Sequence, residues 1–242
     1  MTSDKAVIVV GAGDALGGAI ARRFARGGLV AVPSRRKAEP LKRLVKQIES
    51  EGGKAKGILC DARDEEAVSA LFDRVESEIG PAEVVVFNTG AQHRASILDM
   101  TTRIYRQVWE SAAFAGFVTA REAARRMVKR GTGTIIFTGA TASIRGGATF
   151  ASFSSAKHAL RALAESMARE LGPAGIHVGH IIVDGMIDSE AVREKFPDQV
   201  GALPEGGLLN PDHIAEAYWS MYTQPKDAWT FEMDVRPSVE QW

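Results

Sequence analysis

The chain has 242 residues, of which 45% are hydrophobic and 25% are charged. These fractions are close to globular averages and exclude a disordered, collagen-like or disulfide-framework protein. Thirty basic and thirty acidic side chains give a formal net charge of zero, so there is no general positive field to attract nucleic acid or anionic lipid. Cys60 is the only cysteine, the first residues lack the pattern of a secretory signal peptide, and no apolar run approaches the roughly 18 residues of a membrane span. We therefore expect a soluble, cytoplasmic protein that binds neither nucleic acid nor membrane.

Short β-branched runs alternate with longer amphipathic stretches along the chain, a pattern typical of β-α-β units around a parallel sheet. The predicted strands are 6–10, 29–32, 55–59, 83–87, 134–138, 177–182 and 231–235. The predicted helices are 16–26, 41–51, 65–79, 103–129, 153–171 and 211–222. Residues 185–209 form the one long irregular stretch, and its length indicates a lid over a substrate. The pattern predicts one domain over residues 1–242, with a three-layer, doubly wound α/β fold and a seven-stranded, mainly parallel sheet.

A glycine-rich turn follows the first predicted strand and precedes an alanine-rich helix. Gly11, Gly13 and Gly17 allow a tight turn and let a pyrophosphate approach the backbone at the helix start. The usual dinucleotide spacing places the third glycine at position 16, but Leu16 stands there, so the loop is one residue longer. The alternative is a glycine turn that serves packing alone.

Several motifs in the correct order make nearly the whole chain similar to the short-chain dehydrogenase/reductase family. Gly11 and Gly17 match the outer glycines of the family's first turn, TGxxxGxG, and Asn88 and Gly90 match most of its NNAG strand end. The resemblance implies a Rossmann fold that binds a nicotinamide cofactor. It also implies that Asp61, after the third predicted strand, binds the adenine amino group.

The end of the second predicted strand indicates which nicotinamide cofactor is bound. An acid there would accept hydrogen bonds from a ribose diol and repel a 2′-phosphate. The chain instead has Ser34, Arg35 and Arg36, and guanidinium groups suit a phosphate by charge and geometry. We therefore expect NADP rather than NAD. The alternative is that this charged run is only a solvated loop.

The resemblance implies a catalytic tetrad of asparagine, serine, tyrosine and lysine, and only the lysine is present, as Lys157. The tyrosine position, four residues earlier, is Phe153, and the serine position, thirteen residues before that, is Ala140. The asparagine position aligns with Ala112. A second layout, with the tyrosine seven residues before the lysine, leads to Phe150. The usual proton donor is therefore missing, and ordinary ketone reduction is expected to be very poor.

Two residues are candidates for a substitute acid. The proline and glycine that in this family follow the sixth strand, near the nicotinamide, correspond to Asp184 and Gly185, and Ile187 fits the rest of that motif. Asp184 could donate a proton there, and so could His93, in a loop that faces the substrate in this family. The alternatives are that His93 is a surface histidine and that Asp184 only replaces a turn residue.

Retention of Lys157 beside Phe153 suggests that cofactor binding persists, because ribose hydroxyls would satisfy a buried ammonium. The alternative is a lysine that reaches water.

Three functions stay open: an NADP-dependent oxidoreductase with another proton donor or a substrate that needs none, a catalytically silent NADP-binding sensor or regulatory subunit, and a structural subunit. The substrate is unknown. The resemblance implies a homodimer or homotetramer, and scattered histidines predict no metal site.

Overall fold

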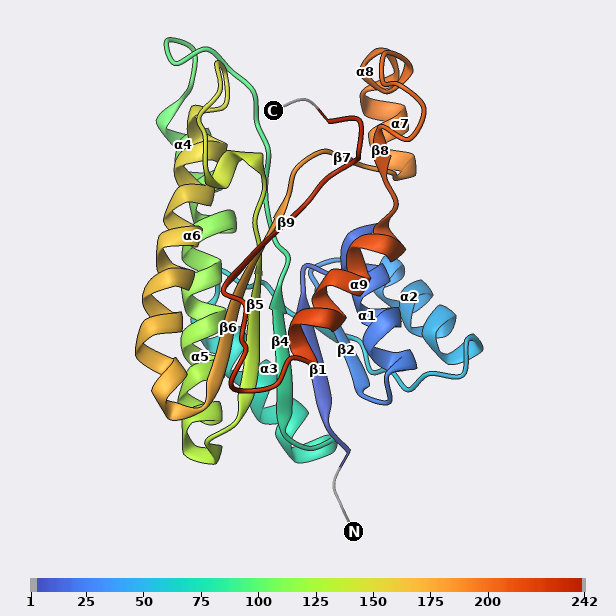
Figure 1. The fold of residues 1–242 in the computed structure, drawn as a ribbon, viewed down its shortest axis with the longest axis vertical. Coiled ribbons are helices and arrows are strands. Elements are labelled where there is room, and N and C mark those ends of the chain that lie inside the picture. The colour runs from blue at the N-terminus through green and yellow to red at the C-terminus, as the bar shows by residue number, and fades with distance from the viewer. Residues whose placement is uncertain (1–3, 241–242) are drawn as a thin grey trace.

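Seven parallel strands form one sheet in the computed structural model, which describes residues 4–240 (Figure 1). From edge to edge the strands are β3 (Ile58–Leu59), β2 (Val30–Arg35), β1 (Ala6–Val10), β4 (Ala82–Phe87), β5 (Gly133–Thr138), β6 (Ile176–Val183) and β9 (Glu232–Val235). Every pairing within this sheet is parallel. The strand order reverses between β1 and β4, which is the switch point of a doubly wound sheet and the usual place for a ligand. The predicted fold class is confirmed.

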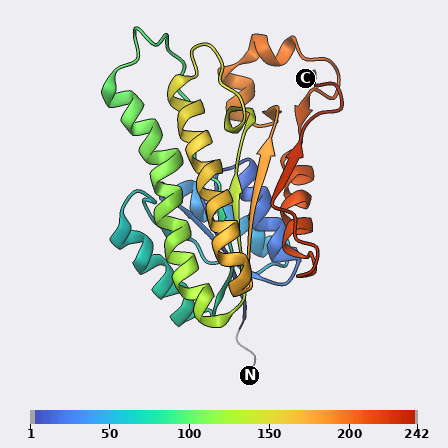
Figure 2. The same cartoon turned by 60° about the vertical axis from the view of Figure 1, so that its left-hand side comes forward.

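Helices cover both faces of the sheet, and alternate residues of β1 pack against opposite layers. Ile8 belongs to the core shared with α3 (Glu65–Glu78), α5 (Ala115–Arg130) and α6 (Ala151–Leu171). Val7 and Val9 belong to the core shared with α1 (Leu16–Arg26), α2 (Ala38–Ser50) and α9 (Pro211–Tyr222). Figure 2 shows α5 and α6 side by side in front of the sheet. None of the helices within residues 4–240 is long and apolar enough to cross a bilayer.

Strand bounds in the second and third β-α units differ from the prediction. β2 continues to Arg35, because the backbone N–H groups of Gly11 and Ala12 both donate to the Ser34 carbonyl and hold the strand end against the turn after β1. β3 is limited to two residues, and Ala55 makes only an isolated bridge to Ala31. An edge strand has a pairing partner on one side only, so apolar residues in sequence do not guarantee a long ladder.

The helix predicted over residues 103–129 is interrupted in its middle. It consists of α4 (Thr102–Trp109), a π-helical turn (Glu110–Phe114) and α5. The segment has no proline to mark the interruption, and a π turn inserts one residue without ending the apolar periodicity. Ala112 lies within this turn. Such turns occur frequently at functional sites.

The segment 185–209 contains regular structure that the sequence did not predict. β7 (Met186–Ile187) and β8 (Leu208–Leu209) pair in parallel as a separate small sheet, and α7 (Glu190–Lys195) and α8 (Pro197–Gly201) lie between them. Elements of two to six residues are too short to show a hydrophobic period. In Figure 1, α7 and α8 project at the upper right, beyond the carboxyl ends of the strands.

Candidate active site

A cavity of about 1150 Å³ opens at the carboxyl ends of the strands. Its walls come from the turn after β1, the ends of β4, β5 and β6, one face of α6, and the segment 185–209. A smaller hollow of about 580 Å³ adjoins it and extends to the end of β2. Both are lined by Gly11, Gly13, Asn88 and Gly90, so the two spaces meet at the switch point. An elongated ligand placed here would lie across the β1 and β4 strand ends.

The turn after β1 requires glycine at two of its positions. Gly11 has a φ of +86°, and a Cβ there would lie 2.9 Å from the Asn88 carbonyl group. A Cβ on Gly17 would lie 2.6 Å from the Gly11 carbonyl oxygen, and the Asn88 Nδ2 group donates to that same oxygen at 3.1 Å. By contrast, a Cβ on Gly13 would meet nothing within 4 Å and would project into open space.

The helix that follows this turn presents free backbone donors to the cavity. α1 begins at Leu16, which is buried and lines the cavity, and the preceding Ala15 has no side chain that could cap the helix. The first turn of α1 carries no acidic residue. Uncapped N–H groups and the positive end of the helix dipole attract an anion. The predicted pyrophosphate cradle therefore fits the geometry of the turn.

The end of β2 brings several cations to the smaller hollow. Arg35 lies 3.3 Å from Asp14, and the exposed Arg36 lies 3.8 Å from Asp61. Ser34 is buried beside them. Sequence reasoning missed Arg63, whose guanidinium donates two hydrogen bonds to Asp61, at 2.9 Å and 2.6 Å.

The Asp61 carboxylate is already engaged by cations. The hydrogen bonds from Arg63 are the main reason that the pKa of Asp61 falls to about 2. The predicted adenine contact of Asp61 would have to form alongside this pair. The spacing of Arg63, two residues after Asp61, is the signal that could have identified it.

Lys157 lies in the cavity wall and is almost completely buried. The residue is 4% exposed, and its ammonium donates to the Thr138 carbonyl at 2.7 Å. The nitrogen lies 5.8 Å from the centre of the Phe153 ring. Burial lowers the pKa of Lys157 to about 8. The interpretation of Lys157 as a solvent-exposed helix residue is therefore wrong.

The positions predicted for the rest of the tetrad are not all at the cavity. Phe153 and Ala140 line it, as does Phe150, which has the Arg94 guanidinium 4.4 Å above its ring. Ala112 is completely buried in an apolar cluster against which Phe153 packs, and it is not a lining residue. The structure thus brings two of the three positions predicted to be substituted to the cavity.

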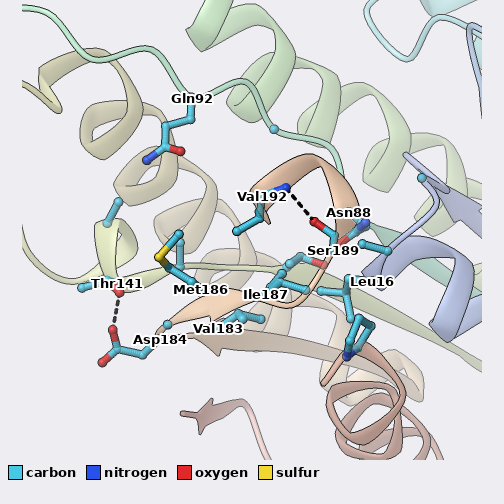
Figure 3. Close-up of a pocket in the computed structure, with 18 of the residues that line it drawn as sticks. Leu16, Asn88, Gln92, Thr141, Val183, Asp184, Met186, Ile187, Ser189 and Val192 are labelled. Carbon is cyan, nitrogen blue, oxygen red and sulfur yellow. Dashed lines mark hydrogen bonds between the residues drawn. The ribbon is translucent and has the colours of Figure 1, made fainter. Parts of the chain in front are cut away.

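Asp184 occupies a hydrogen-bonded position at the end of β6. It is 6% exposed and accepts a hydrogen bond from the Thr141 hydroxyl (Figure 3). Its carboxylate lies 3.8 Å from the Arg145 guanidinium. Its backbone N–H donates to the Val235 carbonyl at 2.9 Å. The Asp184 carboxylate therefore acts as a hydrogen-bond acceptor, between the Thr141 hydroxyl and the Arg145 guanidinium.

His93 is not at the cavity. His93 and its neighbours Gln92 and Arg94 are all exposed, but only the two neighbours line the cavity. Successive residues of an extended loop point to different sides, so a position three residues beyond Gly90 did not fix the direction of the side chain. The expectation that His93 faces the substrate is not supported.

The segment 185–209 does contribute to the cavity. Gly185, with a φ of +154°, packs against Pro237, where a Cβ would be 2.9 Å from Cδ. Ile187, Ser189 and Val192 line the cavity, and the Ser189 hydroxyl accepts from the Val192 N–H at 3.2 Å (Figure 3). Within residues 4–240 no group of histidine, cysteine or acidic side chains could hold a metal ion.

Comparison with known proteins gives consistent matches. The family model for short chain dehydrogenase matches residues 5–200. The 3-oxoacyl-[acyl-carrier-protein] reductase MabA of Mycobacterium avium is 33% identical over 203 residues, which cover 82% of this chain and 74% of that protein. The solved structure of a short-chain dehydrogenase from Rhodopseudomonas palustris is 45% identical, with a TM-score of 0.83 and coverage of 96% and 98% of the two chains. A metagenomic short-chain oxidoreductase in complex with NADP is 25% identical, with a TM-score of 0.83 and coverage of 98% and 99%.

Proposed function

The chain belongs to the short-chain dehydrogenase family, and we propose that it is an NADP-dependent oxidoreductase that works without a tyrosine proton donor. The observation that carries this proposal is Lys157, whose ammonium is buried in the cavity wall beside a phenyl ring. A lysine ammonium has three donors, and described residues occupy one of them. Burying such a group without a ligand to satisfy it is costly.

NADP is supported by the charges around the smaller hollow. Arg35, Arg36 and Arg63 line it, and no acid stands at the end of β2. Guanidinium groups bind a phosphate with two parallel hydrogen bonds, whereas a ribose diol prefers a carboxylate. The relative solved in complex with NADP is a further argument for this cofactor.

The residues of this chain would hold the cofactor in defined places. The N–H groups at the start of α1 would bind the pyrophosphate, Lys157 would bind the nicotinamide ribose, and Ile187 lies where the nicotinamide end is expected.

The bound cofactor supplies the hydride. Holding the hydride donor and acceptor in contact contributes on the order of 7 to 11 kcal/mol, while loss of a general acid costs about 100- to 10,000-fold. Slow turnover is therefore compatible with Phe153.

Turnover of NADPH with a 3-oxoacyl thioester tests the proposal, since the mycobacterial relative is named for that substrate class. We expect slow, steady NADPH oxidation that survives Phe153→Ala, because the phenyl ring supplies no proton. His93→Ala is the matched control and should leave the rate unchanged, since His93 lies outside the cavity wall. Complete absence of NADPH oxidation, with all substrates, would contradict an enzymatic role.

A catalytically silent NADP-binding protein is the second candidate. It is favoured by the side chains at the predicted tetrad positions, because Ala140 and Phe153 line the cavity and neither they nor Ala112 carry a group that could donate a proton. The triple variant Phe153→Tyr, Ala140→Ser, Ala112→Asn should then create carbonyl reduction in a protein that has none. Failure of a folded, NADPH-binding triple variant to gain activity would argue that the cavity itself has diverged.

A further inference from the structure

Lys157 has the only ammonium among the described residues that line the cavity, and it borders the place where a phenol is missing. Its nitrogen is 2.7 Å from the Thr138 carbonyl oxygen and 5.8 Å from the centre of the Phe153 ring. On a third side it faces Gly90, where a Cβ would lie 3.7 Å from the nitrogen. The remaining N–H groups have no partner among the described residues, and Lys157 lines the cavity in which the cofactor ribose and the substrate would lie.

We propose that Lys157 itself donates the proton to a carbonyl substrate, an assignment that rests on the proposed NADP-dependent reduction. The carbonyl carbon takes up a hydride from the reduced nicotinamide cofactor, and the π pair of the C=O bond moves onto oxygen. One N–H bond of Lys157 breaks as the new O–H bond forms. The substrate is reduced to an alcohol, the cofactor is oxidised, and the neutral amine regains a proton from water.

The environment of Lys157 suits this role. A general acid is most effective when its pKa lies near the working pH, and burial lowers the pKa of Lys157 to about 8. The charged groups behind it do not alter this. His180 on β6 is fully buried, burial lowers its pKa to about 4, and it is therefore neutral at pH 7. Glu232 on β9 is paired with Arg161 on α6, at 2.6 Å.

Ser154 offers a hydrogen bond that Ala140 cannot. It lies three residues before Lys157 on the same helix, lines the cavity, and is 7% exposed. Its hydroxyl oxygen has no hydrogen-bond partner within residues 4–240. Side chains three apart on a helix are neighbours, so this buried hydroxyl lies on the same side of α6 as the ammonium, and a rotation of the Ser154 side chain would bring it to the substrate oxygen.

The test compares Lys157→Arg with the wild type in NADPH-dependent reduction of a 3-oxoacyl thioester. Arginine keeps the positive charge and the donors for ribose but does not release a proton in this pH range. We expect kcat to fall by at least about 100-fold in Lys157→Arg while the Kd for NADPH stays within a few-fold. The double variant Lys157→Arg, Phe153→Tyr should recover activity, because a phenol then supplies the proton. Lys195→Arg, on the exposed outer side of α7, is the matched control and should behave as the wild type.

The pH dependence provides a second signature. The wild-type rate should fall as pH rises past about 8, the pKa of Lys157, because only the ammonium can donate. An NMR titration of the 13C-methylated lysines should show one amine titrating near this pH, and that signal should be missing in Lys157→Arg.

Each outcome separates the two proposals. A wild-type rate retained by Lys157→Arg, or a rate that stays flat across pH 8, overturns Lys157 as the donor and leaves the oxidoreductase proposal standing. Tight NADPH binding without turnover at any pH also overturns it and favours the silent candidate. Absence of NADPH binding overturns the proposed function itself.

Discussion

At the residue scale, Lys157 determines how the site can be interpreted. The sequence predicts that it is the retained member of the tetrad, and its placement in the cavity wall follows from the helical spacing of residues 150, 153 and 157, all of which line the cavity. The same sequence could not show whether the ammonium reached water. That depended on how tightly α6 packs against the end of β5, where the Thr138 carbonyl accepts its hydrogen bond.

Replacing Lys157 by methionine should stabilise the protein without cofactor. The folded-state pKa of Lys157, about 8, is below its ordinary value of 10.5, so the folded state binds fewer protons between these values. Wild-type stability should therefore rise with pH from about 8 to 10.5, by up to about 3 kcal/mol from this group. Urea unfolding at pH 7 should show Lys157→Met to be the more stable protein, and the gap should narrow at pH 10.5. A stability difference between the two proteins that does not depend on pH would contradict an origin in the buried charge of Lys157.

The glycine turn gives a matched pair of substitutions. Gly17→Ala places a Cβ 2.6 Å from the Gly11 carbonyl oxygen. This substitution should lower the free energy of unfolding by about 1 to 3 kcal/mol. Gly13→Ala meets nothing within 4 Å, so the melting temperature should stay near that of the wild type. Because this methyl group projects into the cavity, Gly13→Ala should weaken NADPH binding. Equal stability of the two variants, measured by thermal unfolding, would contradict the role assigned to the turn.

Residue-level predictions succeeded where neighbours in sequence create the feature. Gly11 and Gly17 could be recognised because a strand and a helix flank them. Arg63 and the direction of His93 could not, because both depend on how a loop folds over a strand end.

At the scale of elements, long periodic segments were predictable and short ones were not. β1 and α1 have the predicted bounds, since apolar alternation and the glycine turn mark them. The π turn between α4 and α5 and the small elements of the segment 185–209 have no periodic signal. The segment 185–209 borders the larger cavity, and the π turn borders the smaller hollow through Ser111.

The segment 185–209 should act as a lid that cofactor binding holds in place. Its helices α7 and α8 have no buried residues, whereas its lining residues face the cavity. Limited trypsin digestion should cut after Arg193 and Lys195, and saturating NADPH should slow these cuts by up to about 100-fold at roughly 100 times its Kd. Cleavage after Lys129, at the far end of α5, serves as the control and should not change. Equal protection at both places would indicate general stabilisation rather than a lid.

At the scale of the whole molecule, the outer face of α4 and α5 carries exposed aromatic side chains. Trp109 and Phe117 are each 39% exposed, and Phe114 stacks on Trp109 with ring centres 6.4 Å apart. Such a surface fits the homodimer or homotetramer expected from the family resemblance. Light scattering should show an oligomer that Phe117→Glu converts to a smaller species, while Leu59→Glu, at the sheet edge, leaves it intact. A monomeric wild type would contradict this expectation.

The central claim is that the molecule binds NADP through the α1 turn and the cations at the end of β2. Calorimetric titration of the purified protein with NADPH, and with NADH as the comparison, tests it most directly. A charge-assisted hydrogen bond contributes about 1.5 to 3 kcal/mol, so NADPH should bind roughly 10- to 100-fold more tightly than NADH. The Arg35→Ala, Arg36→Ala variant should lose this preference and keep its affinity for NADH. Binding of NADH as tightly as NADPH, or binding of neither, would contradict the account.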